Sequence, residues 1–186
     1  DQKQHVELTR DIAQRFNHLY GETFVIPEPV IPAAGARVMG LDDPTAKMSK
    51  TYAHVRGHAV RMLDEPREIE RAIMRAKTDS GGDIRFSEDP EKAGVNNLLG
   101  IYKAVTGKTE AETERDFADA RGYGDLKKRV AEVVLAELQP IRSRYDELIA
   151  DPAELSRLLA IGADQARAIA GPKVDEIKQR MGLTLG

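Results

Sequence analysis

The chain has 186 residues, enough for one large domain or two small ones with a genuine hydrophobic core. Its 28 basic and 31 acidic side chains give a formal charge of −3, which argues against a uniformly basic nucleic-acid coat but not against a local basic site. The absence of cysteine excludes disulfides, zinc–thiolate and iron–sulfur sites, and a cysteine nucleophile. The sequence has no apolar run long enough to span a membrane, so we expect a cytoplasmic protein without a membrane partner.

The first part of the chain changes from a helical to an extended pattern. Between residues 4 and 20, apolar side chains recur at three- and four-residue spacing, and Gly21 follows as a stop signal. From residue 23 to residue 40, prolines and glycines interrupt β-branched residues. This pattern predicts extended chain or one or two short strands, with residues 37–41 as the best candidate.

The remainder of the chain is predicted to form a packed helical bundle. Helix starts are marked by a proline with an acidic residue in the first turn, at Pro66, Pro90 and Pro152. Thr109 and Glu112 have the spacing of a capping box. The longest apolar pattern, residues 126–148, crosses Pro140, where a helix should kink or restart.

Residues 47–51 form the clearest candidate for chemistry. They read Lys-Met-Ser-Lys-Thr, so two lysines lie three residues apart beside hydroxyl groups. A lysine ammonium is a point charge on a long stem, suited to a polyphosphate whose charge shifts during a reaction. The plain alternative is a solvated, lysine-rich turn.

Two other polar patterns carry weaker signals. His54 and His58 are four residues apart, as metal ligands on a helix can be, but the pattern supplies no third ligand. We therefore predict no metal site and interpret both as ordinary surface or interface histidines. Residues 1–5 place polar groups at a helix start, where backbone N–H groups favour an anion, and a plain N-cap is the alternative.

Taken in order, these motifs resemble the bacterial-type tryptophanyl-tRNA synthetases, which are class I aminoacyl-tRNA synthetases. Residues 1–5, Asp-Gln-Lys-Gln-His, resemble the family's Asp-Gln-x-x-His motif, and residues 47–51 are similar to its Lys-Met-Ser-Lys-Ser loop. Further landmarks are residues 78–80, 89–99 and 122–127. Thr51 stands where the family usually has serine, and Tyr52 where an acidic residue is common.

The resemblance implies a mainly α-helical fold in two parts. Residues 1–56 would be the C-terminal part of a Rossmann-type α/β catalytic domain, and residues 57–186 a helical region that binds the tRNA anticodon. The first residue is Asp1 rather than Met, and the family's N-terminal nucleotide-binding half has no counterpart in the sequence. We therefore expect a part of a longer enzyme that is inactive alone.

The resemblance also implies roles for individual residues. Asp1 would contact the nucleotide ribose, Gln2 the tryptophan amino end or the adenylate, and Val38 the adenine through its backbone. Lys47 and Lys50 would be catalytic, because they would stabilise charge on the leaving pyrophosphate. The ATP phosphates would be held by Lys47, Met48, Ser49, Lys50 and Thr51.

The implied reaction is the ATP-dependent ligation of tryptophan to its tRNA through tryptophanyl-adenylate. ATP would enter as a substrate with Mg²⁺, without a tightly bound cofactor, and the whole enzyme would be a homodimer. Two alternatives stay open: a noncatalytic helical RNA-binding or interaction module derived from a synthetase, and a tyrosine-specific relative.

Overall fold

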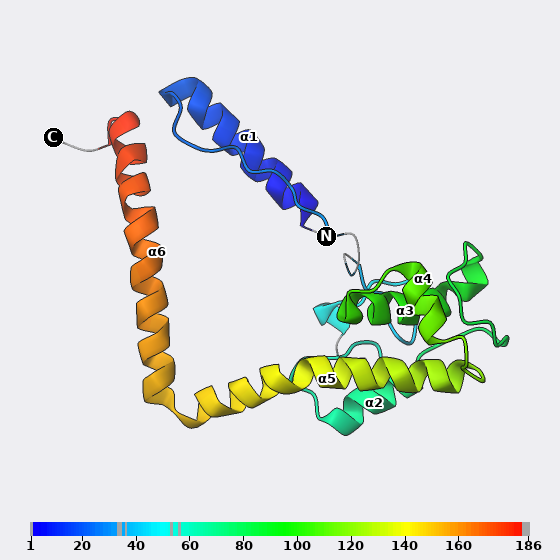
Figure 1. The fold of residues 1–186 in the computed structure, drawn as a ribbon. Helices are drawn as coiled ribbons and strands as arrows, with labels where there is room; N and C mark the ends of the chain where they lie inside the picture. The colour runs from blue at the N-terminus through cyan, green and yellow to red at the C-terminus, as the bar shows by residue number, and fades with distance from the viewer. Residues whose placement is uncertain (1, 33–34, 36, 53, 56, 184–186) are drawn as a thin grey trace. The chain divides into compact units, whose positions relative to one another are not determined.

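The computed structural model describes residues 2–32, 35, 37–52, 54–55 and 57–183, and the prediction of a mainly helical chain is confirmed (Figure 1). The elements are α1 (Lys3–Tyr20), η1 (Lys50–Tyr52), α2 (Pro66–Met74), η2 (Pro90–Lys92), α3 (Ala93–Thr106), α4 (Glu110–Asp116), α5 (Tyr123–Ala150) and α6 (Pro152–Arg180). The described residues include no β-strand. Each helix in this described part is too short or too polar to cross a membrane.

The chain divides into two compact units. One consists of residues 1–31 together with 146–186, and the other of residues 32–145. α5 runs without interruption through Pro140, so the helix does not restart there. The predicted boundary at residue 56 divides the chain by function and not by compactness, and it stays a prediction.

Local signals fix where the helices begin. The proline starts are confirmed, since Pro66 opens α2, Pro90 opens η2 and Pro152 opens α6. Before α4, Thr109 and Glu112 form the predicted capping box, in which each side chain accepts a hydrogen bond from the backbone N–H of the other. Because first-turn N–H groups have no partner inside a helix, these bonds define the start of α4.

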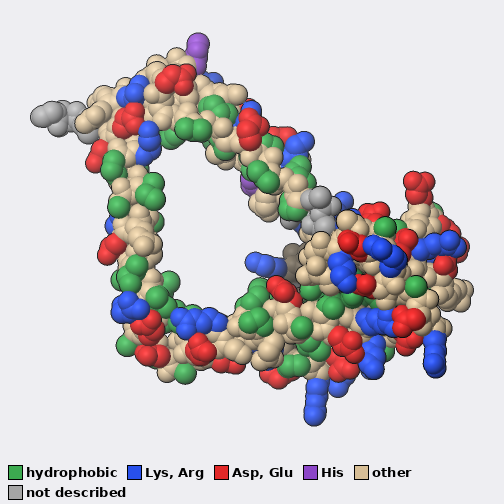
Figure 2. Space-filling view, in the orientation of Figure 1, with side chains coloured by type: hydrophobic (Ala, Val, Ile, Leu, Met, Phe, Trp, Pro, Cys, Tyr) green, Lys and Arg blue, Asp and Glu red, His purple; other side chains and the backbone are tan. Residues whose placement is uncertain are grey.

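The core of the 32–145 unit comes from the apolar stripes of α2, α3 and α5. Its fully buried helical side chains are Ile69, Ile73, Val95, Leu98, Leu99, Leu126 and Val130. Leu41 joins this cluster from the loop segment, and Met48 packs against it. The core therefore holds the chain on both sides of the turn that leads to Lys47. Acidic and basic side chains are interspersed over the face of this unit seen in Figure 2.

In the other unit, α6 contacts the end of α1. Lys173 donates a hydrogen bond to the Thr23 carbonyl at 2.9 Å, and Arg180 donates one to the Tyr20 carbonyl at 3.1 Å. Gly21 ends α1 as predicted, with φ at +86°, a value that glycine adopts readily. Backbone carbonyls at the end of α1 are thus satisfied by basic side chains of α6.

The strands predicted between residues 23 and 41, with 37–41 as the best candidate, are absent from the described part of the chain, so this prediction is wrong. One isolated antiparallel bridge joins Met39 and Lys47. Asn97 of α3 accepts from the Met39 N–H at 3.0 Å and donates to the Met39 carbonyl at 2.9 Å. An amide side chain thus occupies the edge that a neighbouring strand would otherwise pair.

Gly94 provides a test of the packing of α3. A Cβ at this position would lie well inside van der Waals contact with the Lys77 carbonyl oxygen. We expect Gly94→Ala to lower the free energy of unfolding by about 2 kcal/mol, because backbone must move to admit the methyl group. In the matched variant Gly100→Ala, the new Cβ meets no described atom within 4 Å, and stability should rise by about 0.5 kcal/mol. Denaturant titration measures both, and equal effects would contradict this packing.

Candidate functional site

The loop of residues 47–51 is held at its base by two backbone hydrogen bonds. The Gly40 N–H donates to the Ala46 carbonyl at 2.8 Å, and the Met48 N–H donates to the Val38 carbonyl at 3.0 Å. These bonds flank the isolated bridge described above. The structure therefore brings residue 38 and residues 47–51, predicted separately from the sequence, side by side.

The turn that connects these two segments carries a fixed acidic group. The Asp43 carboxylate accepts hydrogen bonds from the hydroxyl of Thr45 at 2.7 Å and from its backbone N–H at 3.0 Å. These bonds hold the pKa of Asp43 below its usual value. The turn therefore has a defined conformation rather than the freedom of a solvated linker.

Within the loop, residues 47–49 are partly buried and residues 50–51 are exposed. Met48 packs against the core and lines an apolar cavity of about 210 Å³ together with Val38 and Leu41. Lys50 and Thr51 are exposed in η1. An apolar anchor at the centre of the loop thus leaves an ammonium and a hydroxyl group toward solvent, a suitable arrangement for binding phosphate oxygens.

Ser49 directly precedes η1, the short helix that carries Lys50. Its carbonyl accepts from the Tyr52 N–H at 3.2 Å, and its hydroxyl oxygen lies 3.4 Å from the same nitrogen. Thr51 and Tyr52, which depart from the family pattern, both lie in this 3-10 turn. The substitutions are therefore accommodated in a regular turn.

Val38 also lines a second cavity, of about 320 Å³, against α3. Met39, Asn97 and Gly100 contribute to its walls. The Asn97 amide is engaged by the Met39 backbone, so it fixes one wall of this cavity.

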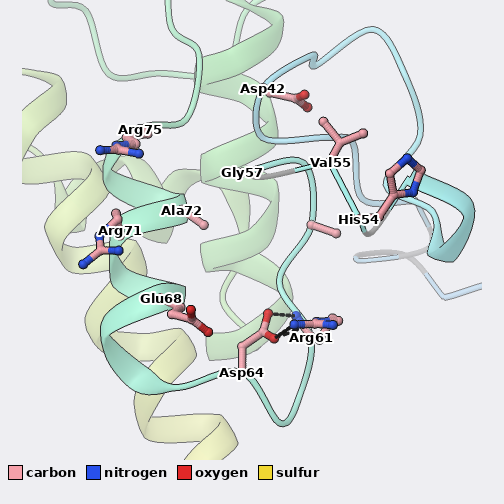
Figure 3. A pocket seen from close by; sticks show the side chains of 11 residues that line it. Asp42, His54, Val55, Gly57, Arg61, Asp64, Glu68, Arg71, Ala72 and Arg75 are labelled. Carbon is pink, nitrogen blue, oxygen red and sulfur yellow. Dashed lines mark hydrogen bonds and ion pairs between the residues drawn. The ribbon is translucent and has the colours of Figure 1, made fainter.

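A larger polar cavity, of about 510 Å³, lies beside Asp42 and α2 (Figure 3). Arg71 lies in α2 and Arg75 is its C-cap residue, and Arg61 forms an ion pair with Asp64 at 2.6 Å. Its charged lining is balanced, with three arginines and three carboxylates: Arg61, Arg71, Arg75, Asp42, Asp64 and Glu68. Residues 47–51 are all described, and they do not line this cavity.

His58 is buried, so its interpretation as a surface or interface residue is wrong. The residue is 4% exposed, and its ring lies between the Asp42 carboxylate and the Lys47 carbonyl. His54 is exposed and borders the polar cavity. Among the described residues, no group of three or more His, Asp or Glu side chains could hold a metal ion.

Two further predicted site residues, Asp1 and Gln2, come from the start of the chain. Asp1 lies outside the described residues. Gln2 is exposed at the N-cap of α1, where its carbonyl accepts from the N–H groups of His5 and Val6 at 3.1 and 3.2 Å. Because α1 and the loop belong to different compact units, the role of Gln2 stays a prediction.

Three landmarks of the family pattern meet in one polar cluster. The Tyr123 hydroxyl donates to the Asp79 carboxylate at 2.8 Å, and Lys92 lies 3.1 Å from the same carboxylate. Burial raises the pKa of Asp79, but hydrogen bonds from Tyr123, Lys92 and the Gly81 N–H outweigh it and give a net lowering. These landmarks therefore tie the starts of α3 and α5 together and form part of the scaffold.

The chain is similar to known proteins over nearly its whole length. Residues 1–139 match the family model described as tRNA synthetases class I (W and Y). The tryptophan–tRNA ligase of Wolinella succinogenes is 49% identical over 98% of this chain. That of Caldanaerobacter subterraneus is 48% identical over 100% of the chain. The chain spans 55% of the length of each of these relatives.

Solved structures give the same result. The tryptophanyl-tRNA synthetase of Mycoplasma pneumoniae matches 98% of this chain with a TM-score of 0.82 and 29% identity. That of Campylobacter jejuni, complexed with ADP and tryptophan, also matches 98% of this chain, with a TM-score of 0.66 and 31% identity. The chain covers 54% and 55% of these two structures.

Asn97 offers a test of how the loop is held. Asn97→Leu leaves the Met39 N–H and carbonyl without their side-chain partner, and we expect backbone amides of residues 47–51 to exchange hydrogen about tenfold faster. The matched variant is Asn96→Leu, which removes bonds to the Ser87 backbone instead. It should loosen the segment around Ser87 and leave loop exchange unchanged. Equal loop exchange in both variants would contradict the assignment.

Proposed function

The chain belongs to the class I tRNA synthetases of the tryptophan and tyrosine family, and from this premise we propose that it supplies the phosphate-binding loop of a tryptophan–tRNA ligase. The observation that carries the proposal is the Lys-Met-Ser-Lys-Thr turn, held beside Val38 by backbone bonds. The relatives named above are tryptophan–tRNA ligases at 48–49% identity, which supports tryptophan as the amino acid.

In the proposed first step, the tryptophan carboxylate attacks the α-phosphorus of ATP. A bond forms between carboxylate oxygen and phosphorus, and the bond to the bridging oxygen breaks, so that pyrophosphate leaves with the electron pair. Lys47 and Lys50 stabilise the negative charge that accumulates on this leaving group. No side chain needs to act as a nucleophile, because positioning and electrostatics lower the barrier.

The other proposed contacts surround this centre. The Val38 backbone lies against the adenine, Asp1 contacts the ribose and Gln2 contacts the tryptophan amino end or the adenylate. Ser49, Thr51 and the backbone of Met48 complete the phosphate site. In the second step, the tryptophanyl group passes from the adenylate to the terminal ribose of the tRNA, and AMP leaves.

We further propose the partners of the natural polypeptide. Residues 57–186 bind the tRNA anticodon, and the enzyme acts in the cytoplasm as a homodimer. Mg²⁺ enters bound to the ATP phosphates, and we assign it no protein ligand. The Campylobacter jejuni structure, complexed with ADP and tryptophan, supports a site for a nucleotide and this amino acid.

Removal of the Lys50 ammonium tests the catalytic role of the loop. In the natural polypeptide that carries this sequence, Lys50→Ala should lower the rate of ATP–pyrophosphate exchange at saturating ATP by roughly 100-fold to 1,000-fold. The KM for ATP should change only a few-fold, because the charge that Lys50 stabilises develops after binding. Lys128→Ala, which removes an exposed lysine of α5, is the matched control and should leave exchange unchanged. Near-normal exchange by Lys50→Ala would reject the proposed role.

Amino-acid dependence separates the remaining alternatives. We expect the kcat/KM of ATP–pyrophosphate exchange to be roughly a hundredfold higher with tryptophan than with tyrosine. Preference for tyrosine would identify a tyrosine-specific enzyme. Binding of RNA with neither amino acid supporting exchange would identify a noncatalytic module.

A further inference from the structure

The His58 ring lies between two hydrogen-bond acceptors at the base of the Lys47–Thr51 loop. Its Nδ1 lies 2.7 Å from Asp42 Oδ1, and its Nε2 lies 3.3 Å from the Lys47 carbonyl oxygen. An ionised carboxylate and a carbonyl accept hydrogen bonds but cannot donate them. Both ring nitrogens can donate at once only in the protonated imidazolium form, so these partners assign a charged ring.

The same residue contacts the chain on both sides of the turn. The Leu41 N–H donates to the His58 carbonyl at 3.0 Å. A Cβ on Gly40 would overlap the imidazole, so glycine admits the ring at this position. After the loop, the ring of Tyr52 meets the imidazole edge-on, with centroids 5.7 Å apart. The ring therefore fills the space enclosed by the loop and the segment before it.

We infer that His58 is a positioning residue whose protonated ring, paired with Asp42, holds the backbone of Lys47, so that loss of this proton loosens the loop. A neutral ring has one N–H. The shorter bond to the Asp42 carboxylate retains it, because a charged acceptor makes the stronger hydrogen bond. The Nε2 lone pair then faces the Lys47 carbonyl, and this contact becomes repulsive. The loop is therefore ordered while both ring nitrogens carry protons and loosens when the ring loses one of them.

Other charged groups surround this pair. Tyr52 lies against the ring. Near Leu41 are two further charged residues, Asp43 and Lys77. The backbone N–H of Lys77 donates to the Leu41 carbonyl. On the Asp42 side, the polar cavity carries His54, Arg61, Asp64, Glu68, Arg71 and Arg75 (Figure 3). Of these, His54 is the other group that normally titrates between pH 5 and 8, so it requires its own control.

The inference rests on the proposed function only for its catalytic consequence, because the pair holds the carbonyl of a lysine assigned to the pyrophosphate site. Loosening of the loop would misplace that lysine, whereas the order of the loop itself does not depend on ATP. The structural part can therefore be tested on the chain without ATP or tRNA.

The test follows ring protonation and loop order together. Imidazole ¹⁵N NMR should show both nitrogens of His58 protonated at pH 5.5 and one at pH 8.5. Over the same range, trypsin cleavage after Lys47 and Lys50 should accelerate about tenfold, the effect expected from loss of one hydrogen bond. A short lysine peptide corrects for the pH dependence of trypsin itself.

Three variants distinguish the pair from its surroundings. In Asp42→Asn, the amide can donate to Nδ1, so a neutral ring keeps Nε2–H for the Lys47 carbonyl and cleavage should be slow at both pH values. His58→Leu should be cleaved rapidly at both. His54→Gln should retain the wild-type profile. If His58→Leu does not fold, the comparison of Asp42→Asn with wild type still decides.

The outcomes separate this inference from the proposed function. A neutral His58 ring at pH 5.5, or a wild-type pH profile in Asp42→Asn, would overturn it. An active exchange enzyme with pH-independent loop cleavage would also reject the positioning role alone. Loss of ATP–pyrophosphate exchange activity in a protein with the expected cleavage profile would instead reject the proposed function alone.

Discussion

The candidate site depends on how one extended residue, Met39, satisfies its backbone. An extended segment without a sheet leaves N–H and carbonyl groups that must find partners when they are buried. Met39 is bridged to Lys47 on one edge and hydrogen-bonded to the Asn97 side chain on the other. A single amide on α3 thus replaces a strand and attaches the loop to the helical core. The position of Val38 and the direction in which the loop leaves the core follow from this attachment.

The rest of the 32–145 unit stabilises that attachment from a distance. Leu41 and Met48 are held by the apolar cluster, so the turn between them has both ends fixed. The polar cluster of Asp79, Lys92 and Tyr123 ties the start of α3, the helix that carries Asn97, to the start of α5. The residues that carry the proposed chemistry are few, while those that fix their positions are spread over several helices.

The sequence predicts features that depend on local interactions and misses those that depend on distant partners. Pro66, Pro152 and the Thr109 capping box mark helix starts because each acts on its own first turn. The local pattern of residues 37–41 correctly indicates extended chain. The prediction of a strand is wrong because Met39 pairs with the side chain of Asn97, 58 residues away, and not with a neighbouring strand. The burial of His58 was missed for the same reason, since its acceptors lie on another segment. The loop motif itself was found from spacing and residue type, and the structure added its neighbours.

The apolar anchor at Met48 gives the two loop lysines unequal freedom. The backbone of Lys47 is tied to the bridge and to His58, and the next side chain is held in the core. Lys50 lies beyond that anchor, in an exposed turn of three residues. The flexible thioether of Met48 can adapt its packing when the residues that follow it move. In the proposed reaction, Lys50 is therefore the lysine whose backbone can move while pyrophosphate leaves, whereas the backbone of Lys47 stays attached to the bridge.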